Sequence, residues 1–154
     1  MAVEVTITTR IGRTPGDVFA ALTAVERFPE WLIASGIVGV TRSDDGPLVV
    51  GSRLTIRQIV AGRSSVIDAE VTSLVSPTTL SLKGRDPDGV TVRFEAHLAP
   101  DGDLATTLRW SVRIGLPLKY RFFESMVAPQ AQRAAALDVE ALKRRLESVA
   151  GISS

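Results

Sequence analysis

The chain has 154 residues, of which 45% are hydrophobic and 23% are charged, and its formal net charge is +1 at neutral pH. These values are typical of one globular domain and exclude disordered and collagen-like chains. Cysteine is absent, which excludes disulfides, thiolate metal sites and a cysteine nucleophile, and favours a reducing, cytoplasmic location. We find no secretory signal and no apolar run near the ~20 residues that span a bilayer. We therefore expect a single domain over residues 1–154, without integral membrane association.

The first elements follow from the spacing of apolar residues. Residues 3–11 alternate between apolar and polar, which predicts a half-buried strand. Thr14 and Pro15 then suit the cap and the first turn of a short helix. The apolar residues of that helix recur at helical spacing, as Val18, Ala21, Leu22 and Val25. A second short helix is predicted over residues 26–34, ended by Gly36.

Residues 37–116 alternate almost throughout, and clusters rich in Gly, Pro, Asp and Ser interrupt the alternation. This spacing predicts six more antiparallel strands, each with one buried and one solvent-facing side. The side chains predicted to face the core are Leu54, Ile56, Gln58, Val60, Ile67, Ala69, Val71, Leu80, Leu82, Val90, Val92, Phe94, Ala96, Leu98, Leu104, Thr106, Leu108, Trp110, Val112 and Ile114.

After Pro117 the apolar period returns to 3.6 residues, which predicts a long helix that ends at Gly151. Pro129 should kink this helix, because proline lacks the amide hydrogen that the carbonyl one turn earlier needs. Consecutive strands joined by tight turns exclude a parallel crossover fold. The fold class is therefore α+β, with a seven-stranded curved antiparallel sheet around a long C-terminal helix and two short helices after the first strand. Only the C-terminal helix is long enough to cover the apolar face of the sheet.

Several short segments, taken in their order and spacing, resemble the START-like (SRPBCC) superfamily in its bacterial polyketide cyclase/dehydrase and lipid-transport branch. These segments are residues 14–19, 27–31, 50–53, 76–80, 101–108 and 142–147. The resemblance covers nearly the whole chain and implies the helix-grip form of the α+β fold. It also implies a hydrophobic-ligand site between the sheet and the last helix, near residues 28–31 and the front of that helix.

The candidate pocket combines inward-facing strand residues with aromatic and thioether side chains. Gln58 and Thr106 are polar side chains on inward-facing positions, where an unpaired group costs about 1–3 kcal/mol. Either they bond to backbone or water, or they orient an oxygen atom of the ligand. The candidate pocket residues are Phe28, Trp31, Leu54, Ile56, Gln58, Val71, Phe94, Thr106, Leu108, Trp110, Phe122, Phe123, Met126, Val127 and Gln130.

The sequence contains no visible catalytic constellation. The only histidine, His97, falls on a solvent-facing position of its strand, so we predict no role in a triad or metal site. Asp68 and Glu70 share a solvent-facing side with Arg53 and Arg57, and we interpret them as solvated charges. We expect no metal and no cofactor. The basic residues predicted on the outer face of the sheet are Arg53, Arg57, Arg85, Arg93, Arg109 and Arg113, and because acids interleave with them we expect no nucleic acid as a partner.

Three functions remain open at this point. The first is binding or carriage of a small hydrophobic molecule, such as a lipid, isoprenoid or polyketide-like ring system, by a monomer or homodimer. The second is a cyclase or dehydratase, for which the polar residues near the pocket are Tyr120, Gln58 and Thr106; none of these is a good general base near neutral pH. The third is a protein-interaction module, such as a toxin partner or chaperone cofactor, which the resemblance also allows.

Overall fold

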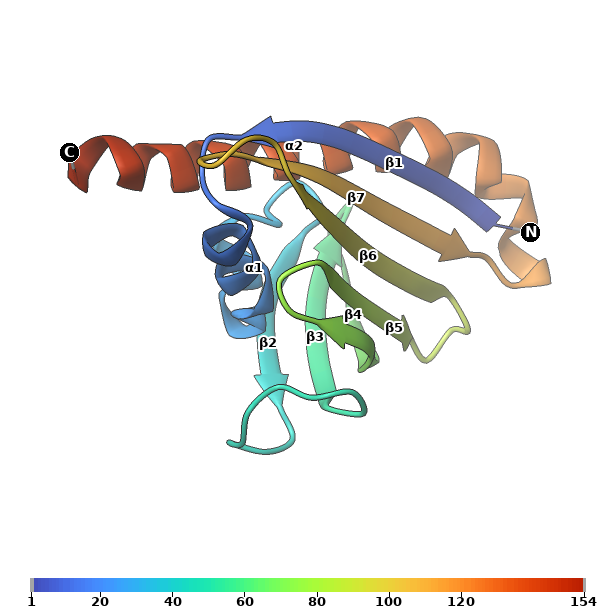
Figure 1. The fold of residues 1–154 in the computed structure, drawn as a ribbon. Coiled ribbons are helices and arrows are strands. Elements are labelled where there is room, and N and C mark those ends of the chain that lie inside the picture. Colours follow the sequence, from blue (N-terminus) through green and yellow to red (C-terminus); the bar gives the residue numbers. More distant parts are fainter. Residues whose placement is uncertain (1, 154) are drawn as a thin grey trace.

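A computed structural model describes residues 2–153, with side chains described for residues 2–148. One antiparallel sheet has the strand order β1-β7-β6-β5-β4-β3-β2, and the long helix α2 (Glu124–Ser153) runs along one of its faces (Figure 1). The predicted α+β architecture is confirmed. The strands are β1 (Ala2–Ile11), β2 (Ile37–Arg42), β3 (Arg53–Val60), β4 (Arg63–Val75), β5 (Thr79–Arg85), β6 (Thr91–Pro100) and β7 (Thr106–Gly115).

The two short helices after β1 differ from each other in type. Helix α1 (Pro15–Thr23) begins as predicted, because the Thr14 hydroxyl accepts a hydrogen bond from the amide of Asp17 at 3.3 Å. The helix predicted over residues 26–34 was wrong in length and type. It is a 3-10 helix, η1 (Val25–Glu30), and turns follow it. Pro29 lies inside η1 and has no amide hydrogen with which to continue a helical series of bonds.

The loop after η1 packs tightly against β3. Gly36 has a φ of +77°, and a Cβ atom at this position would lie 2.1 Å from the carbonyl oxygen of Ile59. Only glycine fits this approach without displacing the backbone of β3. The amide of Ile59 also donates to the Gly36 carbonyl at 2.8 Å, and the loop is thereby held beside the end of β3.

The inner face of the sheet carries most of the residues predicted to be buried. Leu54, Ile56, Leu108 and Trp110, for example, are each 2% exposed or less. Leu104 is a correction, because it is 77% exposed and lies in the turn before β7. That turn closes with a hydrogen bond from the amide of Asp101 to the carbonyl of Ala105, so the chain enters the sheet only at Thr106.

The helix predicted after Pro117 consists of two parts. A 3-10 helix, η2 (Leu118–Phe123), precedes α2, and α2 continues past Gly151 to Ser153. Pro129 lies inside α2, and the kink predicted there stays a prediction. The buried residues of α2 recur at helical spacing and face the sheet; they are Ala135, Asp138, Val139 and Leu142.

The C-terminal half of α2 is tied to the end of β1. Glu147 accepts a hydrogen bond from the amide of Gly12 at 2.8 Å, and Lys143 donates to the carbonyl of Arg10 at 2.6 Å. The bond from Gly12 lowers the pKa of the Glu147 carboxyl, burial opposes this effect, and Lys143 adds to it. These contacts fix the register of the helix on the sheet.

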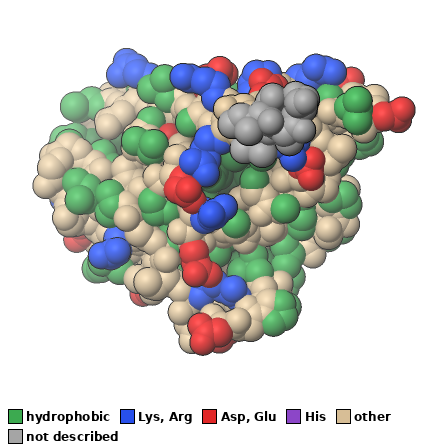
Figure 2. Space-filling view, turned by 90° about the vertical axis from the view of Figure 1, so that its left-hand side faces the viewer, with side chains coloured by type: hydrophobic (Ala, Val, Ile, Leu, Met, Phe, Trp, Pro, Cys, Tyr) green, Lys and Arg blue, Asp and Glu red, His purple; other side chains and the backbone are tan. Residues whose placement is uncertain are grey.

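The surface around α1 carries charges of both signs. Figure 2 shows this face, on which acidic and basic side chains alternate among apolar ones. Glu30 of η1 pairs with Arg145 of α2 at 3.0 Å, and Arg42 of β2 lies 3.8 Å from Glu26. No helix within residues 2–153 is long and apolar enough to cross a membrane.

We predict that Leu142→Ala lowers the free energy of unfolding by about 2–5 kcal/mol, because it leaves a cavity where α2 packs on the sheet. Leu137→Ala is the matched control, since Leu137 belongs to the same helix and is 53% exposed; its effect should stay within about 0.5 kcal/mol. Urea unfolding followed by circular dichroism measures both. Equal losses in the two variants would contradict the packing described here.

Candidate functional site

A cavity of about 170 Å³ lies between the inner face of the sheet and the first half of α2. Strands β3, β6 and β7 form one wall, α2 forms the other, and the loop after η1 closes one side. The walls are predominantly apolar. The lining residues are Ala34, Ser35, Gln58, Val60, Val92, Phe94, Val112, Ile114, Val127, Gln130, Ala131, Ala134 and Ala135.

The cavity exists because α2 presents small side chains along this part of its length. Ala131, Ala134 and Ala135 face the sheet, and each contributes a single side-chain carbon atom. Further along the helix, Val139 and Leu142 are both 2% exposed and belong to the packed core. The same helix therefore packs against the sheet at its C-terminal half and leaves space at its N-terminal half.

A row of aromatic rings leads from the short helix η1 to the cavity. Phe28 meets Trp31 edge-on at 5.9 Å between ring centroids, and Trp31 meets Trp110 at 5.3 Å. Trp110 stacks on Phe94 at 5.6 Å, and Phe94 lines the cavity. The indole N–H groups of Trp31 and Trp110 are buried and have no hydrogen-bond partner within the described part of the chain. Such buried donors are costly unless a water or ligand atom pairs with them.

Asp138 is a buried acid on α2, with 1% of its surface exposed. Its carboxylate accepts hydrogen bonds from the amides of Ala34 at 2.7 Å and Ser35 at 3.2 Å, and from the Ser35 hydroxyl. Burial raises the pKa of the Asp138 carboxyl, and the three hydrogen bonds oppose this effect. Gln58 of β3 in turn donates to the Ser35 carbonyl at 2.8 Å. This chain of bonds joins α2, the loop and β3 along one wall of the cavity.

The structure brings together only some of the residues that the sequence placed in the pocket. Gln58, Phe94, Val127 and Gln130 line the cavity. Another group is buried but lines no part of it, and consists of Phe28, Trp31, Leu54, Ile56, Val71, Thr106, Leu108 and Trp110. Thr106 bonds to backbone, the first of the two alternatives above, because its hydroxyl donates to the Arg13 carbonyl at 2.8 Å.

Three further candidates lie on the surface. Phe122 is 83% exposed, Phe123 is 52% exposed and Met126 is 67% exposed. The segment that joins β7 to α2 lies at the end of the sheet (Figure 1), where Phe122 borders a surface hollow together with Ala2 and Val3 of β1.

The sequence interpretation missed the alanines and Asp138. A run of small residues on the sheet-facing stripe of a helix signals a gap, and Ala131, Ala134 and Ala135 supply that pattern. A charged residue inside an apolar stripe signals a buried polar contact, and Asp138 has that position. Ser35 carries no comparable signal, because its role depends on where the loop meets α2.

The other charged candidates lie on the outer face. His97 has a side chain 39% exposed, and its Nε2 atom lies 3.7 Å from a carboxylate oxygen of Glu95. Glu70 stands opposite Arg53 in the sheet, as expected, whereas Asp68 stands opposite Thr55 and not Arg57. Within the described residues, no three acid, histidine or cysteine side chains come together as a group that could hold a metal ion.

Comparison with known proteins identifies similar folds. A family model described as polyketide cyclase/dehydrase and lipid transport matches residues 2–147. A search of the curated proteins finds no match. A START superfamily protein from Mycobacterium smegmatis is 20% identical, with a TM-score of 0.74 over 95% of this chain and 98% of that one.

Two structures with assigned enzyme names are also similar in fold. The Zhui aromatase/cyclase from Streptomyces sp. R1128 is 13% identical, with a TM-score of 0.76 over 96% of this chain and 94% of that one. Norcoclaurine synthase from Thalictrum flavum, as a point mutant with a transition-state analogue, is 11% identical, with a TM-score of 0.69 over 96% of each chain. At these sequence identities the similarity shows a common fold and assigns no reaction to this chain.

We predict that Asp138→Asn changes the pH dependence of stability. The pKa of Asp138 lies above its ordinary value of 3.8, so the folded protein keeps this proton to a higher pH than the unfolded chain does. The contribution of this protonation to the free energy of unfolding is complete below pH 3.8 and is lost as the pH rises through the folded-state pKa of Asp138. The wild type should therefore lose stability relative to the variant between acidic and neutral pH.

Chemical unfolding at a series of pH values measures this difference, and Leu137→Ala, which removes no titrating group, gives the baseline. If the wild type instead gained stability relative to Asp138→Asn toward neutral pH, the prediction would be wrong. The hydrogen bonds would then affect the pKa of Asp138 more than burial does.

Proposed function

Because the chain belongs to the polyketide cyclase/dehydrase and lipid transport family, we propose that it binds a small apolar molecule in the cavity between the sheet and α2. The main support for this proposal is the apolar cavity between the sheet and the first half of α2. The polar side chains along its walls are those of Ser35, Gln58 and Gln130. A cavity with apolar walls and a few polar groups is typical of small-molecule sites.

The size of the cavity limits the ligand. About 170 Å³ is close to the ~150 Å³ of an apolar cavity that holds benzene, and it is smaller than the ~300–1,000 Å³ typical of sites for drug-sized molecules. The cavity therefore suits a ligand of one or two rings or a short acyl chain. A long-chain lipid would require α2 to move away from the sheet.

The polar groups favour a ligand that carries an oxygen atom. Gln58 is held in place by its bond to the Ser35 carbonyl, and its own carbonyl can accept a hydrogen bond from a hydroxyl group. The unpaired indole N–H groups of Trp31 and Trp110 would donate to an oxygen atom that reached beyond Phe94. An aromatic alcohol or ketone satisfies these groups better than a hydrocarbon does.

The ligand enters, in this proposal, between the β3–β4 hairpin and η2. Val60 at the end of β3 and Val127 near the start of α2 both line the cavity. The guanidinium of Arg63, just past the hairpin, lies 6.0 Å from the centre of the Tyr120 ring in η2. Arg63 is exposed and Tyr120 is half-buried, so this cation–π contact is weak and can open at small cost.

A cyclase or dehydratase is the second candidate function, and Asp138 is the observation that favours it. Its carboxyl is buried and has a raised pKa, and perturbed carboxyl groups are common among catalytic acids and bases. Three donors from Ala34 and Ser35 occupy this carboxyl, and it does not line the cavity. Catalysis would require the loop to release Asp138, so ligand binding remains the function that the geometry supports best.

We predict that Ala131→Phe blocks binding of 2-naphthol, because the larger side chain fills the cavity. The dissociation constant should rise at least about tenfold, which corresponds to ~1.4 kcal/mol. Ala136→Phe is the matched control on the exposed side of α2 and should leave affinity unchanged. Isothermal titration calorimetry gives the affinities, and native mass spectrometry tests whether the ligand leaves chemically unchanged. Wild-type protein that fails to bind 2-naphthol and short fatty acids would refute the proposal.

We predict that Pro129→Ala slows ligand exchange by a larger factor than it changes the unfolding equilibrium. Alanine restores an amide hydrogen that can bond to the Ser125 carbonyl, which stiffens α2 beside Val127 and Gln130. Stopped-flow tryptophan fluorescence follows exchange of 2-naphthol, and Gln132→Ala controls for a surface change on the same helix. Exchange at the wild-type rate would show that this part of α2 is not the gate.

A further inference from the structure

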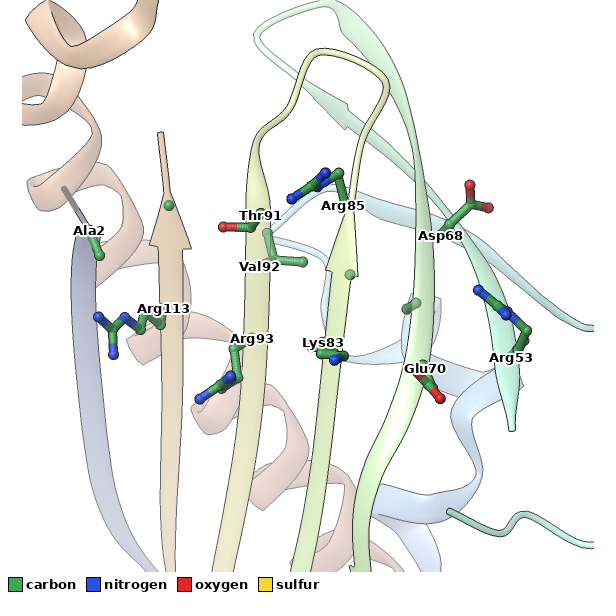
Figure 3. Close-up of a pocket in the computed structure, with 13 residues that line it drawn as sticks. Ala2, Arg53, Asp68, Glu70, Lys83, Arg85, Thr91, Val92, Arg93 and Arg113 are labelled. Carbon is green, nitrogen blue, oxygen red and sulfur yellow. The ribbon is translucent and has the colours of Figure 1, made fainter. Parts of the chain in front are cut away.

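The outer face of the sheet carries a row of basic side chains in direct register. Arg113 of β7 stands opposite Arg93 of β6, and Arg93 stands opposite Lys83 of β5 (Figure 3). Arg85 lies two residues along β5 from Lys83. Like charges directly opposite one another destabilise a sheet. We call these four side chains the basic row.

Four acids lie close to the four cations of the basic row, but in the described part of the chain none of them forms a salt bridge with it. Glu4 stands opposite Arg113, Glu70 opposite Lys83 and Asp68 opposite Arg85, while Glu95 follows Arg93 by two residues. The salt bridges found within residues 2–148 include none of the four cations. Arg53 lies on β3, on the other side of Asp68 and Glu70 from the basic row (Figure 3).

The basic row borders a groove of about 700 Å³. Small residues form part of its floor, where Gly115 stands between Ala2 and Thr91 in the sheet. A Cβ atom at position 115 would lie 2.3 Å from the Thr91 hydroxyl oxygen, so any other residue at this position would displace the Thr91 side chain. The lining has five basic residues (Arg53, Lys83, Arg85, Arg93 and Arg113) and two acidic ones (Asp68 and Glu70), although the whole chain has a net charge of only +1.

We propose that this groove binds a compact anion with two or more phosphate groups. Neighbouring strands lie about 4.8 Å apart, so the basic row extends roughly 10 Å across β7, β6 and β5. One phosphate contacts part of such a row, whereas a chain of phosphates spans it. Guanidinium groups bind phosphate oxygens through paired hydrogen bonds, and the Thr91 hydroxyl adds a donor.

The described lining of the groove bears on which phosphate compounds it can recognise. Its lining residues include no aromatic side chain on which a base could stack. The bound anion is therefore recognised by its phosphates, whether they belong to free polyphosphate or to a nucleotide.

The groove and the apolar cavity lie on opposite faces of one sheet. Arg93 and Phe94 are neighbours on β6, and their side chains point to opposite sides because side chains alternate along a strand. Arg113 and Val112 of β7 have the same relation. The two sites share Val92 among their lining residues, and a neutral cavity ligand such as 2-naphthol allows each site to be tested alone.

Titration calorimetry with sodium tripolyphosphate at low ionic strength tests the site directly. Saturable binding is expected in the wild type, and Arg93→Gln should weaken it about tenfold. Arg109→Gln is the matched control, since Arg109 lies on β7, faces the same side and does not line the groove. No saturable binding, or equal losses in the two variants, would overturn the proposal. Tighter binding of ADP than of pyrophosphate indicates a nucleotide, and equal binding indicates phosphate alone.

Thermal unfolding without any anion provides a second test. Arg93→Gln should raise the melting temperature, because it removes the central charge between Lys83 and Arg113. The gain should shrink as salt increases, since the screening length falls from about 10 Å at 0.1 M to about 3 Å at 1 M. A lower melting temperature in Arg93→Gln would overturn the proposal. Binding of 2-naphthol by Arg93→Gln should stay at the wild-type level, which separates a failure of this site from a failure of the cavity.

Discussion

One helix has to cover the apolar face of a seven-stranded sheet, and the side chains of α2 determine how much of it is filled. Val139 and Leu142 pack in the C-terminal half, whereas Ala131, Ala134 and Ala135 leave a gap in the N-terminal half. Because protein interiors are otherwise close-packed, a change from large to small residues along one helix is enough to create a cavity. The cavity is thus a consequence of helix composition, and the sheet needs no irregularity to produce it.

The polar contacts of α2 divide it in the same way. Glu147 and Lys143 tie its C-terminal half to the end of β1, and Asp138 holds the loop at Ser35. Before Asp138, the cavity-lining part of the helix contains Pro129, which cannot donate a backbone hydrogen bond. The C-terminal half of α2 is thus tethered, whereas the part beside the cavity lacks one helical hydrogen bond. We therefore expect the part beside the cavity to be displaced more easily.

Local patterns predicted the fold well, because alternation and capping depend on neighbouring residues. The inward side of the strands and the Thr14 cap are examples. The site was harder to predict, because it depends on contacts between distant segments: Asp138 bonds to the amide of Ala34, 104 positions away. Phe122 shows a second limit, since its hydrophobicity predicted a pocket position although the side chain is 83% exposed.

The sheet itself connects the two sites in a way that depends on the charge of the ligand. Phe94 lines the cavity while Arg93 borders the groove, so about one layer of backbone separates them. A neutral ligand in the cavity hardly senses the basic row, whereas a carboxylate lies within one screening length of it at moderate salt. An anion in the groove would cancel this attraction, and by thermodynamic reciprocity an anionic ligand in the cavity would weaken anion binding in the groove.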